Sequence, residues 1–289
     1  MDYIDLGATL FVPATHKALF EIVCEGKYKA LKSVLIDAED GIDEKDLEKA
    51  KEQIQKLLIQ YEKKELHLFL RPKDVECLEE LLSMEGVEKV DGFILPKFSL
   101  QNSAKYLQLL EKKEFYIMPS IEGLELFERE KLKTLRDILL KYKKKILLVR
   151  FGLEDMLKQL GMKRSSDLSV FDYSVTSNVL GELLSLFKSS GFAVSGGVYP
   201  YFKNTDGFIK DVKRDLREGL FSKTLIHPKQ ITLTNELYKV DEEEYLWAKA
   251  IVQSDTNIFR YEDTMAELKT MLPYAKEVLR RFDVYGLRT

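Results

Sequence analysis

Residues 33–45 read SVLIDAEDGIDEK, and they place an apolar run directly before a group of acids. The run at residues 34–36 (VLI) is typical of a strand that is buried on both faces. Asp37, Glu39 and Asp40 follow it, although burying a carboxylate is costly unless it is paired, hydrogen-bonded or bound to a metal ion. The stretch therefore predicts a buried parallel strand whose C-terminal end opens into a polar site.

The same arrangement recurs along the chain, where short apolar runs of strand length alternate with charged, amphipathic stretches of helix length. The runs are ATLFVP (8–13), SVLIDAE (33–39), LHLFLRP (66–72), VDGFILPK (90–97), FYIMPSIE (115–122), KILLVRFG (145–152), FAVSGGVY (192–199) and KTLIHP (223–228). Eight such units in roughly 230 residues match a (β/α)8 barrel in number and length. A doubly wound open sheet, the competing architecture, would carry a glycine-rich first turn, but this turn reads PATHK. We therefore predict an α/β fold, a TIM (β/α)8 barrel with a C-terminal helical extension.

The predicted barrel occupies residues 1–235, and the pattern changes in residues 236–289. Residues 235–253 and 264–282 show helical periodicity, with no ninth strand expected between or after them. These helices could form a cap on the chain's own barrel or an arm that reaches a neighbouring subunit. The sequence leaves both interpretations open.

The overall charge excludes several classes of partner. Among 289 residues, 45 Lys and Arg stand against 48 Asp and Glu, which gives a net charge of −3. The chain lacks the excess of positive charge that would predict binding to nucleic acid or to an anionic membrane. No apolar run approaches the roughly 18 residues of a membrane span, and the first residues lack the basic region of an export signal. We therefore expect a cytoplasmic protein without nucleic-acid or membrane partners.

Polar residues gather where the predicted strands end, which is where a (β/α)8 barrel builds its active site. They are Glu39, Asp40, Arg71, Lys97, Glu122, Asp155, Tyr199 and His227. Glu122 and Asp155, from adjacent strand ends, are candidate ligands for a hard divalent ion such as Mg²⁺. No histidine-rich or cysteine set of the kind that binds zinc accompanies them. The alternative is that these acids only neutralise Arg71 and Lys97.

Two basic residues could act on a substrate at this end of the barrel. The planar fork of Arg71 suits a carboxylate or an enolate oxygen, and it could equally pair with Glu39 or Asp40; the two interpretations are compatible. Lys97 could be a Schiff-base nucleophile if it were desolvated. A lysine surrounded by acids keeps its proton, which favours an electrostatic role for Lys97.

With these residues laid out, the chain resembles the HpcH/HpaI aldolase family, in its citrate lyase β-subunit-like branch. The resemblance covers roughly residues 8–235, and the order and spacing of its motifs carry it. The matching motifs are LFVPAT (10–15), IDAEDGI (36–42), LRP (70–72), GFILPK (92–97), PSIEG (119–123), FGLEDMLKQLG (151–161), GVY (197–199) and KTLIHPKQI (223–231). Within the family, the sequence resembles a divergent C–C bond lyase branch found in stress- and tellurite-resistance gene clusters.

The resemblance implies a Mg²⁺-dependent carbon–carbon lyase or aldolase, with Mn²⁺ as an alternative ion, that assembles into a homo-oligomer such as a trimer or hexamer. Its substrate would be a small 2-oxo or hydroxy acid or a thioester of one, cleaved through a metal-stabilised enolate. Glu122 and Asp155 would bind the metal ion. Arg71, Glu39 and Asp40 would be the catalytic set, and the substrate would contact Arg71, Lys97 and Gly152.

Three departures from the family pattern leave use of a CoA or acyl-carrier thioester open. The arginine that commonly precedes the LFVP element is replaced by Ala8 and Thr9, and the strand-3 element R-x-N reads RPK (71–73). Residues 270–279 keep the proline of a common C-terminal element but lack its aspartate. Two other functions therefore stay open beside the lyase: a phosphoenolpyruvate-type enzyme on the same fold, and a barrel that binds a metabolite or partner without turnover.

Overall fold

The computed structural model describes residues 1–63 and 65–288. The chain divides into two compact units, Met1–Ile231 and a C-terminal unit that begins at Thr232. The helix α9 (Lys229–Tyr238) runs across this division, and the boundary predicted after residue 235 also falls within it.

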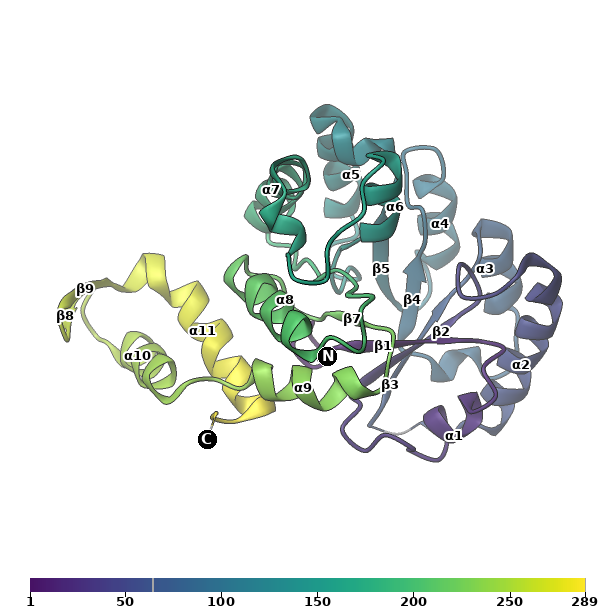
Figure 1. The fold of residues 1–289 in the computed structure, drawn as a ribbon, viewed down its shortest axis with the longest axis horizontal. Coiled ribbons are helices and arrows are strands. Elements are labelled where there is room, and N and C mark those ends of the chain that lie inside the picture. The colour runs from purple at the N-terminus through teal and green to yellow at the C-terminus, as the bar shows by residue number, and fades with distance from the viewer. Residues whose placement is uncertain (64, 289) are drawn as a thin grey trace. The chain divides into compact units, whose positions relative to one another are not determined.

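The first unit is built on seven named parallel strands in the order β6-β5-β4-β3-β2-β1-β7 (Figure 1). Their bounds are β1 (Thr9–Pro13), β2 (Ser33–Asp37), β3 (His67–Arg71), β4 (Gly92–Leu95), β5 (Tyr116–Ile121), β6 (Arg150–Phe151) and β7 (Thr224–Leu225). The register pairs Asp37 at the end of β2 with Arg71 at the end of β3. Strand ends that carry charge are thereby brought side by side.

The ring closes between β6 and β7 through the predicted seventh strand. There the pairing is reduced to single parallel bridges, Val149 with Val194 and Ser195 with Phe221. The two glycines that follow explain why no longer strand forms, because glycine weakens a strand. At Gly196 the backbone also packs closely, since a Cβ atom there would lie 2.4 Å from Asp215 Oδ2. With these bridges, eight parallel segments close the ring, and the predicted TIM barrel is confirmed.

Helices follow most of the strands and cover the outside of the barrel (Figure 1). They are α1 (Leu19–Val23), α2 (Leu47–Gln60), α3 (Val75–Leu82), α4 (Ser103–Leu110), α5 (Arg129–Leu140), α6 (Leu153–Gln159), α7 (Ser174–Ser189) and α8 (Thr205–Arg217). Their apolar positions recur every three or four residues, so each helix buries one stripe, as α2 does with Ala50, Ile54 and Leu57. A core cluster that includes Leu35, Phe69 and Met118 ties the strands together.

The C-terminal unit contains α10 (Glu242–Gln253) and α11 (Leu268–Tyr285), and also an antiparallel hairpin of β8 (Ile258–Tyr261) and β9 (Thr264–Glu267). The expectation that no further strand occurs here was wrong. The helix predicted from residue 264 begins only at Leu268, because residues 264–267 pair with β8 across a tight turn in which Glu262 has φ 52°. Phe259, Tyr261 and Ala266 pack into the core of this unit, so packing of the hairpin outweighs the helical periodicity.

None of the described helices combines the length and the apolar character that crossing a bilayer needs.

Candidate active site

The buried pair of Asp37 and Arg71 fixes one side of the site. Arg71 donates from Nε to Asp37 Oδ1 at 2.6 Å and from Nη2 to Oδ2 at 2.8 Å. The same carboxylate accepts the backbone N–H groups of Glu39 and Gly41, at 3.0 and 2.9 Å. Burial lowers the pKa of Arg71, but the hydrogen bonds and the charge of Asp37 raise this pKa by more, so that it lies above its ordinary value. Arg71 is thus a permanently charged, rigidly held guanidinium.

Glu39, Asp40 and Lys97 continue this cluster outward. Glu39 Oε2 lies 3.0 Å from Arg71 Nη1, and Glu39 Oε1 accepts from Lys97 Nζ at 2.5 Å. Lys97 Nζ also lies 3.4 Å from Asp40 Oδ1. Burial lowers the pKa of Lys97, but the hydrogen bond to Glu39 raises it by more. Lys97 therefore stays protonated, which supports the electrostatic role and argues against a Schiff-base nucleophile.

Glu122 follows β5 and is buried, with 4% of its surface exposed. Burial raises its pKa to about 7, the negative charges of Glu39 and Asp155 add to this rise, and Ser120 and Arg71 oppose it. Among the described residues, nothing forms a hydrogen bond with Glu122 Oε2. A buried carboxylate oxygen without a partner is costly, so this atom indicates that a cation or a ligand belongs beside it.

Gly152 and Asp155 approach Glu122 from the next strand and helix. A Cβ atom at Gly152 would lie 2.4 Å from Glu122 Cγ, so only glycine leaves room for the glutamate. Asp155 lies in the first turn of α6. Gln159, one turn later, donates to the backbone carbonyls of Glu122 at 2.6 Å and of Asp155 at 3.1 Å, which links the two carboxylate-bearing segments.

A cavity of about 300 Å³ opens at this end of the barrel. Its lining residues come from the ends of several strands and the turns after them: Phe11, Asp40, Arg71, Ile94, Ser120, Glu122, Arg150, Phe151, Gly152, Leu153, Glu154, Asp155, Val198, Thr224 and Ile226. Of the predicted site residues, the structure brings together Asp40, Arg71, Glu122, Gly152 and Asp155. Glu39 and Lys97 instead line a neighbouring hollow, which Asp40 also borders.

The donor set in this cavity suits a hard divalent cation. No group of three or more His, Cys, Asp or Glu side chains placed to hold a metal occurs within residues 1–63 and 65–288. Mg²⁺ needs only one or two protein carboxylates, because water and substrate oxygens complete its octahedron. Glu122, with its buried oxygen, and Asp155 supply that number.

Two charged residues of this region are not in the predicted site set: Asp37, although it is one of the three acids noted after the first apolar run, and Arg150. Asp37 is the acid that grips Arg71, and its position as the last residue of β2, paired in register with Arg71, is the signal that could have identified it. Arg150 lines the cavity from β6, and only 3% of its surface is exposed. A charged residue within the apolar run KILLVRFG was the available signal for Arg150.

Similar proteins share this architecture. A citrate lyase from Burkholderia xenovorans LB400 superposes with a TM-score of 0.76 at 16% identity, covering 99% of this chain and 94% of its own. The CitE protein of Mycobacterium tuberculosis, solved in complex with magnesium, acetoacetate and coenzyme A, gives a TM-score of 0.69 at 19% identity, covering 95% of this chain and 97% of its own. These likenesses support the fold.

Sequence comparison finds a further lyase. The mitochondrial citramalyl-CoA lyase of Rattus norvegicus is 24% identical over 275 residues, which span 86% of this chain and 76% of that protein. The predicted relationship to citrate lyase-like enzymes of the HpcH/HpaI family is confirmed, and so is the predicted class of enzyme, a carbon–carbon lyase. The family model described as C–C bond lyase of the TIM-barrel fold matches residues 1–287, and the chain belongs to this family.

Proposed function

We propose that this lyase is Mg²⁺-dependent and makes or breaks a carbon–carbon bond in a small 2-oxo or hydroxy acid, or in a thioester of one, through an enolate. The observation that carries the proposal is Glu122 Oε2, which has no hydrogen-bond partner among the described residues and is buried at the edge of a cavity that Asp155 and Arg71 also line. A pocket that combines a spare carboxylate oxygen with a fixed cation suits an anionic substrate bound together with a metal ion.

When the carbon–carbon bond next to a carbonyl-bearing carbon breaks, the electron pair of that bond stays on the fragment that becomes the enolate. The hydroxyl group of the other fragment loses its proton and becomes a carbonyl group. In this proposal Arg71, which lines the cavity, stabilises the developing enolate oxygen, and its two hydrogen bonds to Asp37 hold it in one orientation. Preorganised charge of this kind in a water-poor site is usually the largest single contribution to catalysis. A Mg²⁺ or Mn²⁺ ion held by Glu122 and Asp155 would supply Lewis-acid stabilisation of the same negative charge.

The two acids after β2 have different surroundings. Asp40 lines the cavity and can accept the proton that leaves the substrate hydroxyl. Glu39 is buried between Arg71 and Lys97 and acts through them, by fixing their positions and charges. Lys97 and Gly152 keep their predicted assignments as substrate contacts, with Gly152 the one that lines the main cavity.

The solved CitE complex contains coenzyme A, which favours a thioester substrate for this chain as well. The replacement of the arginine before the LFVP element by Ala8 and Thr9 argues for the free acid. Competition between free acids and their CoA thioesters in one binding assay separates the two. Three features stay predictions: the homo-oligomer, the cytoplasmic location and membership of the stress- and tellurite-resistance branch. Light scattering measures the oligomeric state.

Exchange of the methyl protons of pyruvate in heavy water tests the proposal, because exchange requires the enolate but no second substrate. We expect wild-type protein with Mg²⁺ to accelerate exchange, as followed by proton NMR, and a chelator to abolish the acceleration. Arg129→Met, on the exposed face of α5, should behave as wild type. Absence of Mg²⁺-dependent exchange with pyruvate, 2-oxobutyrate and acetyl-CoA would overturn the proposal.

A further inference from the structure

Gln159, the last residue of α6, connects the two segments that carry the proposed metal ligands. Its Nε2 atom donates to the backbone carbonyl of Glu122 at 2.6 Å and to that of Asp155 at 3.1 Å. Glu122 follows β5, whereas Asp155 lies in the first turn of α6. One amide group therefore holds together two segments that are far apart in the sequence. The predicted site residues do not include Gln159.

The tether meets Glu122 where the pairing of β5 with β6 ends. The last pair of that ladder joins Ile121 to Phe151, and the N–H group of Gly152 still donates to the carbonyl of Ile121 at 3.1 Å. Glu122 lies one residue past this pair, and its own carbonyl accepts from the Gln159 side chain instead. The Gln159 amide thus holds Glu122 at a point that the strand ladder does not reach.

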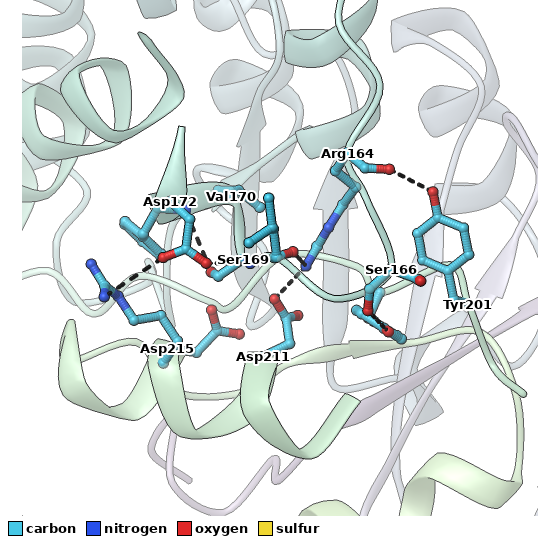
Figure 2. A network of polar contacts seen from close by, with 12 residues as sticks. Arg164, Ser166, Ser169, Val170, Asp172, Tyr201, Asp211 and Asp215 are labelled. Carbon is cyan, nitrogen blue, oxygen red and sulfur yellow. Dashed lines mark hydrogen bonds and ion pairs between the residues drawn. The ribbon is translucent and has the colours of Figure 1, made fainter. Parts of the chain in front are cut away.

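The other end of the tether is fixed as well. With seven residues, α6 is too short to be stable on its own, so its position depends on tertiary contacts. The chain that follows it is anchored at Arg164, which donates to Asp211 Oδ1 at 2.5 Å and whose carbonyl accepts from the Tyr201 hydroxyl at 2.5 Å (Figure 2). Gln159 therefore ties Glu122 to a helix whose C-terminal connection is itself held in place.

The spacing of two carboxylates bears on the choice of metal ion. Mg²⁺ requires a near-ideal octahedron with oxygens at about 2.0–2.1 Å, whereas Ca²⁺ accepts a flexible arrangement at about 2.3–2.6 Å. We propose that Gln159 is a positioning residue, which fixes the spacing of the Glu122 and Asp155 segments and thereby favours Mg²⁺ over the larger Ca²⁺. This inference rests on the proposed function, because it takes Glu122 and Asp155 as the metal ligands.

A purely structural role for Gln159, as a cap on two carbonyl groups, makes a different prediction. A general loss of stability lowers the affinity for both ions alike. Looser spacing of the carboxylates lowers the affinity for Mg²⁺ more than that for Ca²⁺, because Ca²⁺ tolerates longer and less regular contacts. The readout is therefore the ratio of the two affinities, which a loss of stability leaves unchanged.

The experiment is calorimetric titration of MgCl₂ and of CaCl₂, each alone, into wild type and Gln159→Met. Methionine has a similar length but no donor, and Gln159 is an exposed residue, so the substitution leaves the core packing in place. We expect the Mg²⁺ affinity of the variant to fall by about tenfold or more, and its Ca²⁺ affinity to stay within about threefold of wild type.

Two further variants test whether the hydrogen bonds are responsible. Gln159→Lys restores a donor of similar reach, as Lys89 shows by donating to the carbonyls of Leu58 and Ile59. It should keep most of the wild-type ratio, although its charge lowers both affinities. Gln55→Met is the matched control, because Gln55 on α2 makes the same kind of bond, to the carbonyl of Glu85 at 3.0 Å. It should bind both ions as wild type does.

Each other outcome has a distinct meaning. An unchanged ratio in Gln159→Met, whether or not both affinities fall, would overturn the role of Gln159 and leave the proposed function intact. A change of ratio in Gln55→Met as large as that in Gln159→Met would also overturn it. If Gln159→Met does not fold, Gln159→Ala, which carries the best helix former, takes its place with the same expected ratio. Failure of wild type to bind Mg²⁺ would overturn the metal site of the proposed function, and the inference with it.

Discussion

Two clusters of buried charge lie in the barrel unit, and they differ in what their side chains face. At the ends of β2 and β3, Arg71 lines the cavity and is held by Asp37 and Glu39, and Glu122 keeps a buried oxygen without a hydrogen-bond partner among the described residues. Against α8, Arg164 pairs with Asp211 (Figure 2). Lys223 pairs with both Asp211 and Asp215.

The α8 cluster contains two cations and two acids, and each of its ion pairs is 2.7 Å or shorter. The cavity cluster, by contrast, presents charge toward space that a ligand can enter. The difference teaches that burial of charge alone does not indicate function. A functional site is indicated where a buried charge faces a cavity.

The largest expected effect comes from breaking the α8 cluster. Lys223→Met leaves Asp211 and Asp215 as two buried carboxylates without their shared cation, which should lower the free energy of unfolding by about 3–5 kcal/mol. Denaturant titration measures this. Glu182→Gln, which removes the exposed pair with Arg129, is the control and should change stability by less than about 1 kcal/mol. A loss of similar size in both variants would contradict the distinction between buried and exposed pairs.

Breaking the cavity cluster should affect the reaction more than the fold. Arg71→Lys keeps the charge but loses the fork that Asp37 holds, so enolate formation should fall by about 10²–10³-fold. Proton exchange of pyruvate reports the rate, and a thermal melt reports the fold. If the variant exchanges protons at the wild-type rate, Arg71 does not act on the substrate.

A smaller effect is expected where the backbone approaches Glu122. Gly152→Ala places a Cβ atom 2.4 Å from Glu122 Cγ, which should destabilise the protein by about 1–3 kcal/mol and weaken Mg²⁺ binding. Gly181→Ala on α7 is the matched control, because a Cβ atom there has no neighbour within 4 Å. That control should be neutral or slightly stabilising. Equal stabilities of the two variants would show that Glu122 can move aside.

The smallest expected effect is a dependence of Mg²⁺ affinity on pH. Burial raises the pKa of Glu122 to about 7, and only its ionised form binds a cation well. Affinity should therefore rise with pH through this value, by about tenfold between pH 6 and pH 8, and calorimetry at several pH values measures it. An affinity that does not change over this range would remove Glu122 from the metal site.

The sequence predicted most of the barrel because its strands are apolar runs, and it predicted where the site lies because parallel strands end at one edge. The hairpin β8–β9 escaped prediction, since short residue runs such as TMAE fit strand and helix patterns equally well. The sequence also did not predict which charged side chains of the site pair with one another. Which acid holds Arg71 depends on register, and Lys97 turns toward Glu39 from a backbone with φ 48°, a conformation that an ordinary side chain rarely adopts.

The most direct test of the central claim is calorimetric titration of Mg²⁺, with and without a 2-oxo acid, into wild type, Glu122→Gln and Asp155→Asn. Asp137→Asn, on the exposed side of α5, serves as the control. We expect wild type and the control to bind Mg²⁺ and the acid cooperatively, and both site variants to lose that binding while remaining folded. Binding by the site variants that matches wild type, or no Mg²⁺ binding by wild type, would contradict the assignment of Glu122 and Asp155 as the metal site.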